Sequence, residues 1–108
     1  KAYSEMTYYS AMALRGLGRK AEARGLLRDL LAHSRQLARL PAKIDYFATS
    51  LPTMLLFDDD LQARQVTTAT FLAAQAHLGL GLKPAGRKLL REVLRRDPSH
   101  AFAADQPV

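Results

Sequence analysis

The chain has 108 residues, of which 48% are hydrophobic and 24% are charged, and its formal net charge at pH 7 is +6. This length and composition are ordinary for a soluble globular protein, so we expect one domain over residues 1–108. Leu and Ala dominate the apolar residues, whereas Ile occurs once and Trp and Cys are absent. Because Leu and Ala favour helices and β-branched residues favour strands, the composition predicts an all-α fold.

The composition also excludes several kinds of site. Without cysteine the chain can form no disulfide, thiol nucleophile or thiolate metal site. It has no signal-peptide pattern and no run of about 18 apolar residues, so we expect no membrane association. The chain opens at Lys1, is richer in Arg than in Lys and contains no Asn. We expect a fragment of a longer bacterial protein that resides in the cytoplasm.

The first third of the chain predicts a helical hairpin. An apolar-periodic helix covers about residues 3–15, and a second covers about 20–37. Gly16 and Gly18 break the chain between them, since glycine supplies the left-handed backbone that commonly ends a helix.

The middle segment, residues 38–59, predicts an irregular helical connection. Pro41 and Pro52 interrupt it, because proline cannot continue a helix interior. We expect a short helix over about 42–50 and an apolar turn over 54–57. Asp58 or Asp59 then caps the next helix, since a carboxylate accepts hydrogen bonds from the free N–H groups at a helix start.

The last part of the chain predicts a second hairpin, with helices over about 60–78 and 84–96. Pro84 falls in a first helical turn, where proline is tolerated. Asp97 precedes Pro98, and a residue before proline avoids the α conformation, so the last helix ends there. With the middle segment included, we expect about five to six helices.

The two hairpins are copies of one unit. At a shift of 63 residues, residues 11–31 and 74–94 carry the same residue at eleven positions, more than a Leu-, Ala- and Arg-rich composition gives by chance. The identical pairs are Ala11/Ala74, Ala13/Ala76, Gly16/Gly79, Leu17/Leu80, Gly18/Gly81, Lys20/Lys83, Arg24/Arg87, Leu26/Leu89, Leu27/Leu90, Arg28/Arg91 and Leu31/Leu94. The copies cover about residues 3–37 and 66–102.

Each copy resembles a tetratricopeptide repeat. The residues that carry the resemblance are Ala11, Leu14, Gly18, Ala23, Leu27, Leu30 and Leu31 in the first copy, and Ala74, Gly81, Gly86, Leu90, Val93, Leu94, Asp97 and Pro98 in the second. The chain departs from the pattern at Arg35, where the closing Pro would fall, and at Gly86, where Ala is usual. The chain as a whole is similar to the C-terminal repeat region of large bacterial tetratricopeptide proteins. The resemblance implies an α-solenoid of antiparallel hairpins, with first helices on a concave groove and second helices on the outer wall.

Apolar residues at matching positions of the two copies predict one core. Its expected members are Ala11, Leu14, Leu27, Leu30, Leu31, Phe57, Ala74, Leu90, Val93 and Leu94. Small residues at Ala11, Ala74 and Gly86 should let the two helices of each hairpin approach closely.

No catalytic or metal site is predicted. His33, His77 and His100 are far apart in sequence, and we expect His77 to pack and hydrogen-bond inside its hairpin. Residues 58–60 are all Asp, but they lack the alternating spacing and the glycine of a calcium loop. The glycine turns do not follow a strand, as a phosphate-binding loop would. We expect no cofactor, no metal and no enzyme activity.

The positive charge lies on the second helix of each hairpin. The basic residues are Arg24, Arg28, Arg35 and Arg39 in the first copy, and Arg87, Lys88, Arg91, Arg95 and Arg96 in the second. Glu22, Asp29 and Glu92 are interspersed, and aromatic residues on which bases could stack are absent from these helices. We expect a solvated wall, with nucleic-acid binding as the less favoured alternative.

Four residues predict a groove that binds protein. Tyr8 and Met12 in the first copy, and Phe71 and Gln75 in the second, fall where the resemblance places residues of the concave surface. Exposed aromatic side chains are common anchors of interfaces. The other aromatic residues are expected to fill the middle of the core; these are Tyr9, Tyr46, Phe47 and Phe57.

These features predict a non-catalytic scaffold that binds a peptide or a protein surface through the concave groove. A structural role is the alternative, in which the repeats pack against a catalytic or carbohydrate-related domain of the same protein or form a homodimer.

Overall fold

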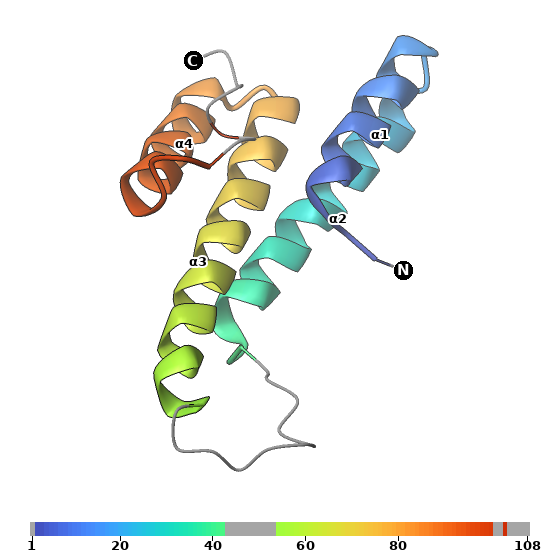
Figure 1. The fold of residues 1–108 in the computed structure, drawn as a ribbon. Helices are drawn as coiled ribbons and strands as arrows, with labels where there is room; N and C mark the ends of the chain where they lie inside the picture. Colours follow the sequence, from blue (N-terminus) through green and yellow to red (C-terminus); the bar gives the residue numbers. More distant parts are fainter. Residues whose placement is uncertain (1, 43–53, 101–102, 104–108) are drawn as a thin grey trace.

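The computed structural model describes residues 2–42, 54–100 and 103. Four α-helices lie in residues 2–42 and 54–100, and these residues contain no strand, which confirms the all-α class. The helices are α1 (Glu5–Gly16), α2 (Lys20–Arg39), α3 (Met54–Gly79) and α4 (Lys83–Arg96) (Figure 1). Apart from Ala42, the short helix expected over 42–50 lies outside the described residues.

A capping box starts α1 two residues later than the sequence pattern predicts. The Ser4 Oγ accepts a hydrogen bond from the Met6 N–H at 3.1 Å, and the Thr7 Oγ1 accepts one from the Ser4 N–H at 3.0 Å. These bonds satisfy N–H groups that would otherwise lack partners at the helix start. Tyr3 therefore precedes the helix.

The start of α3 differs from the expectation. The helix begins at Met54, so Asp58 and Asp59 lie within it and do not form its N-cap. The residues between Pro52 and the aspartates include neither Pro nor Gly. With no helix breaker among them, the helix extends back through the expected apolar turn.

Both hairpins turn through the same backbone motif. Gly18 and Gly81 have φ of 81° and 87°, a region that glycine enters without steric cost. The Arg19 N–H donates to the Leu14 carbonyl at 2.9 Å, and the Leu82 N–H donates to the His77 carbonyl at 2.8 Å. This is the Schellman pattern of helix ends. Its recurrence 63 residues apart places the predicted break at the second glycine of each turn.

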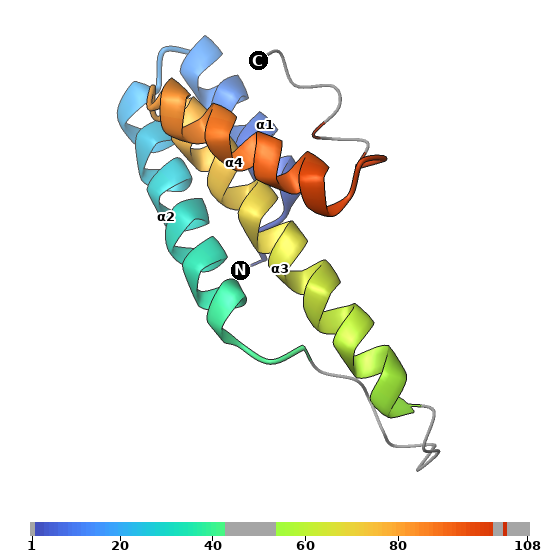
Figure 2. The same cartoon turned by 90° about the vertical axis from the view of Figure 1, so that its left-hand side faces the viewer.

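Helix α3 holds the two hairpins together. It packs against α2 and α1 on one side and against its hairpin partner α4 on another. Figures 1 and 2 show α1 beside α2 and α4 beside α3, with the long α3 running through the centre of the molecule. Gln65 of α3 binds the C-terminal end of α2, because its side-chain amide donates to the Leu37 carbonyl at 3.0 Å and to the Leu40 carbonyl at 2.7 Å.

The core consists of three adjoining clusters. One centres on Leu27 between α1 and α2, one on Leu30 and Leu72 between the hairpins, and one on Phe71 and Leu90 inside the second hairpin. Six of the ten predicted core residues are buried; they are Ala11, Leu27, Leu30, Ala74, Leu90 and Val93. Leu14, Leu31 and Leu94 are half-buried at the cluster edges. The Phe57 side chain lies outside the described residues.

Two glycines allow helices to approach closely. A Cβ on Gly79 would lie 2.7 Å from the Leu27 Cδ2, and a Cβ on Gly86 would lie 2.6 Å from the Leu78 Cγ. Real Cβ atoms do not approach other carbons this closely, so each leucine occupies space that only glycine leaves open. Gly86, which departs from the tetratricopeptide pattern, thus accommodates Leu78 across the second hairpin.

We predict that Leu27→Ala destabilises the protein by about 2–5 kcal/mol, because it removes a fully buried leucine from the contact between three helices. Urea unfolding followed by circular dichroism measures the change. Leu17→Ala is the matched control, since Leu17 is 72% exposed and its truncation should change stability by less than about 0.5 kcal/mol. Equal effects of the two substitutions would contradict the assigned core.

A second prediction compares equivalent glycines. Gly79→Ala should destabilise by about 1–3 kcal/mol, because its methyl group collides with the buried Leu27 side chain. Gly16→Ala, at the same repeat position, should be neutral or stabilise by up to about 1 kcal/mol, since nothing lies within 4 Å of the added methyl and alanine favours helix. Thermal unfolding of the two variants in parallel measures the difference, and a destabilised Gly16→Ala would argue against it.

Candidate functional site

The four predicted groove residues do not form an open surface. Phe71 and Gln75 are 0% exposed, whereas Tyr8 and Met12 are half-buried. The Phe71 ring lies 4.8 Å from the His100 ring, and the Gln75 side-chain amide donates to the Glu5 carbonyl at 3.1 Å. The expectation that Phe71 and Gln75 expose side chains for a partner is therefore wrong, because residues that follow α4 cover the first and α1 covers the second.

Tyr8 and Met12 belong to the contact between α1 and the rest of the chain. Both pack against the buried cluster of Ala11, Ala23 and Leu27, and Tyr8 also packs against the cluster between the hairpins. The Tyr8 ring meets the Tyr9 ring edge-on, with centroids 5.3 Å apart. Tyr9 itself is 40% exposed, so it does not fill the core as expected.

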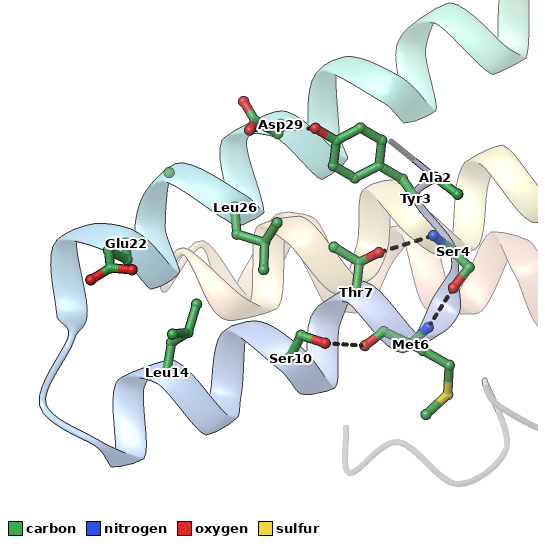
Figure 3. A pocket seen from close by; sticks show the side chains of 11 residues that line it. Ala2, Tyr3, Ser4, Met6, Thr7, Ser10, Leu14, Glu22, Leu26 and Asp29 are labelled. Atoms are coloured by element: carbon green, nitrogen blue, oxygen red, sulfur yellow. Dashed lines mark hydrogen bonds between the residues drawn. The ribbon is translucent and has the colours of Figure 1, made fainter.

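An open groove lies instead between α1 and α2, with a volume of about 650 Å³. Figure 3 shows Leu14 of α1 and Leu26 of α2 pointing into the space between the two helices. The remaining lining residues are Ala2, Tyr3, Ser4, Met6, Thr7, Ser10, Glu22, Gly25 and Asp29. An apolar floor with a few polar groups at its edges is typical of a binding site.

The serine and threonine hydroxyls of this groove hydrogen-bond to the backbone at the start of α1. Ser4 and Thr7 form the capping box, and the Ser10 Oγ donates to the Met6 carbonyl at 3.4 Å. Hydroxyls used in this way orient toward their own helix, and no histidine is among the lining residues. These three hydroxyls therefore serve the backbone of α1, and the groove offers apolar surface beside them.

The α2 side of the groove is acidic. Glu22 and Asp29 lie seven residues apart and therefore on the same face of the helix. Glu22 forms a bidentate ion pair with Arg19 at 2.7 Å, which raises the pKa of Arg19 through the side-chain hydrogen bond. Asp29 lies 3.5 Å from the Tyr3 hydroxyl, a long contact that leaves the carboxylate accessible. The groove therefore favours a ligand that combines apolar and cationic groups.

Next to the groove, α1 presents an apolar surface to solvent. Met6, Tyr9 and Leu17 are 59%, 40% and 72% exposed, and Ala13 and Gly16 between them are exposed as well. These five residues, which we call the outer face of α1, recur at helical spacing and carry no charge. The amino-acid pattern does not predict that this face is exposed, because its apolar spacing is the same as that of a buried face.

The basic residues lie on exposed surfaces of α2 and α4, as expected. Arg24 and Arg28 line an open hollow with Lys20 on α2, and Arg87, Lys88 and Arg91 are exposed on α4. Arg95 and Arg96 both pair with Glu92, at 2.6 Å and 2.9 Å. The hydrogen bond from Arg95 is the largest influence that lowers the pKa of Glu92 to about 2.

The histidines take separate structural positions. The His77 Nδ1 lies 2.7 Å from the Ala73 carbonyl within α3, which confirms the expected hydrogen-bonded histidine. The His33 ring packs against the Tyr3 ring at a tilt of 36°, and the His100 Nδ1 accepts a hydrogen bond from the Ala103 N–H at 3.1 Å. Within residues 2–42 and 54–100, no three His, Asp or Glu side chains come together as metal ligands. None of the helices in the described part of the chain is long and apolar enough to cross a membrane.

Comparison with known proteins does not extend these observations. No family model matches the chain, and no solved structure matches it.

A third prediction concerns Glu92. Because its pKa in the folded protein lies below the ordinary 4.5, its ion pairs stabilise the fold above pH 4.5, and this contribution disappears as the pH falls toward 2. Glu92→Gln should therefore lower the melting temperature slightly at pH 7 but not at pH 2. Arg91→Gln, on the same helix, is the control, and the difference between its melting temperature and that of the unmodified chain should not disappear at pH 2. A pH-independent effect of Glu92→Gln on the melting temperature would contradict the prediction.

Proposed function

We propose that this chain is a non-catalytic protein-interaction module of the tetratricopeptide-like α-solenoid type. Its architecture supports the proposal through two features: identical turns 63 residues apart, and a third helix that packs against both helices of the preceding hairpin. In repeat proteins of this kind each hairpin buries its apolar face against its neighbours, and the stack presents extended surfaces to partners.

The observation that carries the proposal is the groove between α1 and α2. Its walls come from two helices whose positions are fixed by the buried contacts of Ala11, Ala23 and Leu27. A preformed site reduces the ordering cost of binding, which favours peptide capture. The floor at Leu14 and Leu26 suits an apolar side chain, and the accessible Asp29 suits a neighbouring Lys or Arg. The partner is therefore a peptide segment or protein surface with adjacent apolar and basic residues.

Nucleic-acid binding receives less support from the same surfaces. The exposed cations of α2 and α4 attract phosphate, but Glu92 and Glu22 neutralise part of this charge. No aromatic residue belongs to α2 or α4, so these helices offer bases no stacking surface.

The test is selection of peptides from a random display library on the purified chain, followed by fluorescence anisotropy of the selected sequences. Peptides with adjacent apolar and basic residues should be enriched. Gly25→Gln should weaken their binding by at least about tenfold, because the new side chain fills the groove. Ala32→Gln introduces the same side chain at an exposed position of α2 outside the groove and should leave affinity unchanged.

Asp29→Asn tests the acidic side of the groove. It should weaken basic peptides about threefold to tenfold, whereas Gln36→Lys, which changes the net charge by the same amount on the same helix, should have no effect beyond salt-sensitive screening. A DNA duplex should bind only weakly and lose affinity steeply with salt. Selected peptides that are indifferent to both groove substitutions, or duplex binding that is tight at 200 mM salt, would contradict the proposal.

A further inference from the structure

Equivalent surfaces of α1 and α3 differ in how far they are buried. In the second hairpin, α3 directs Leu72 and Ala76 onto Leu30 of α2, and Ala69 on the same face is also buried. The residues 63 positions earlier are Met6, Tyr9 and Ala13 of α1. These belong to the outer face of α1 and are exposed to solvent. Among the described helices, α2 covers this surface on α3, and none covers it on α1.

Both copies also have a glycine at the same position, whose missing side chain leaves space for a leucine; we call this space the notch. The Leu27 side chain occupies the space that a Cβ of Gly79 would need, at 2.7 Å, whereas Gly16 has nothing within 4 Å of the same position. Next to the notch, Leu80 packs against the Leu27 cluster, but its counterpart Leu17 is 72% exposed. The outer face of α1 therefore retains the apolar residues and the glycine with which α3 packs on α2.

We propose that the outer face of α1 docks one amphipathic helix of another polypeptide, which carries the leucine spacing of α2. That spacing is i, i+3 and i+10, as in Leu27, Leu30 and Leu37, whose side chains pack in the clusters that α3 joins. The first leucine fills the notch at Gly16. The later ones cover the surface toward Met6. This site lies beside the peptide groove and goes beyond the function proposed above.

The packing of α2 on α3 also predicts the direction of the docked helix. Along α2 from Leu27 to Leu37, the contacts on α3 run backward from Gly79 to Gln65. The docked helix therefore runs antiparallel to α1. Gln65 binds the last carbonyls of α2, but Ala2 stands at its equivalent position and has no side-chain donor. The end of the partner helix therefore lacks the hydrogen bonds that Gln65 gives α2, so its binding depends more on the apolar contacts and the notch.

A second folded copy of this chain fits the face less well than a separate helix. In each copy α3 already covers the leucines of α2, and the equivalent residues of α4, Leu90 and Val93, are buried against Phe71 and Ala103. Neither Leu-rich helix of a folded copy has this pattern free among the described residues. The occupant is therefore a helix that its own protein leaves unpaired.

The probe is a fluorescent peptide with the sequence of residues 20–40, titrated with the intact chain and followed by anisotropy. We expect saturable binding that Leu17→Glu and Met6→Glu each weaken at least about tenfold. Leu82→Glu, at an exposed leucine of the other hairpin turn, should leave it unchanged. A peptide that carries Leu27→Glu and Leu30→Glu should not bind.

Gly16→Ala gives the sharpest result. It adds apolar surface, so a nonspecific hydrophobic patch would keep or gain affinity, whereas a leucine notch should lose at least about threefold. Circular dichroism confirms that each variant remains folded.

Three outcomes would overturn the proposal. Affinity unchanged by Leu17→Glu and Gly16→Ala would mean that the peptide displaces α2 or binds elsewhere. Self-association of the chain that Leu17→Glu abolishes would assign the face to a second copy. Absence of peptide binding would leave the face without this partner. Library peptides that still respond to Gly25→Gln would in each case preserve the peptide groove, so the two proposals fail separately.

Discussion

The fold depends on the contact between α2 and α3. Leu27 is buried by its hairpin partner α1 on one side and by Gly79 of α3 on the other, and Leu30 meets Leu72 one turn further along. A two-helix hairpin cannot bury its apolar faces by itself, since each helix has more apolar surface than one neighbour covers. The absent side chain at Gly79 brings the hairpins close enough for this contact, and the Gln65 amide closes its far end.

The contact between α2 and α3 also explains which surface of the first hairpin is exposed. Helix α3 covers one side of α1 and α2, and none of the described helices covers the other side, where the groove and the outer face of α1 adjoin at Met6. The charged residues also differ between the surfaces of the molecule. Glu22 and Asp29 border the groove, while most exposed cations of the described residues lie on α4 and on another face of α2, with Arg15 on α1 and Arg64 on α3. If the groove binds a peptide as proposed, Glu22 and Asp29 would favour one whose basic residues lie beside its apolar ones.

The two repeat copies show how neighbours decide the role of a residue. Tyr8 and Phe71 occupy equivalent positions, yet Tyr8 is half-buried between the hairpins and Phe71 is fully buried against His100 and Ala103. Gly16 and Gly79 are likewise equivalent, and only Gly79 receives a leucine. Repeat symmetry thus predicts which side of a helix is available for packing. Whether that side is covered depends on what lies next in space, which the periodicity of one helix does not contain.

Local chemistry by itself determined the helices, their turns and most of the core. Gly18, Gly81 and Asp97 end helices through backbone conformation, so their effect is readable from sequence, as is the burial of Leu27 and Leu90 at matching repeat positions. The cap at Ser4 and the early start of α3 were not predicted, because several nearby residues could begin each helix. Only the tertiary structure decided which apolar side of α1 stays exposed. Met6, Tyr9 and Leu17 have the spacing of core residues, and they are exposed because none of the four described helices packs on α1 where α2 packs on α3.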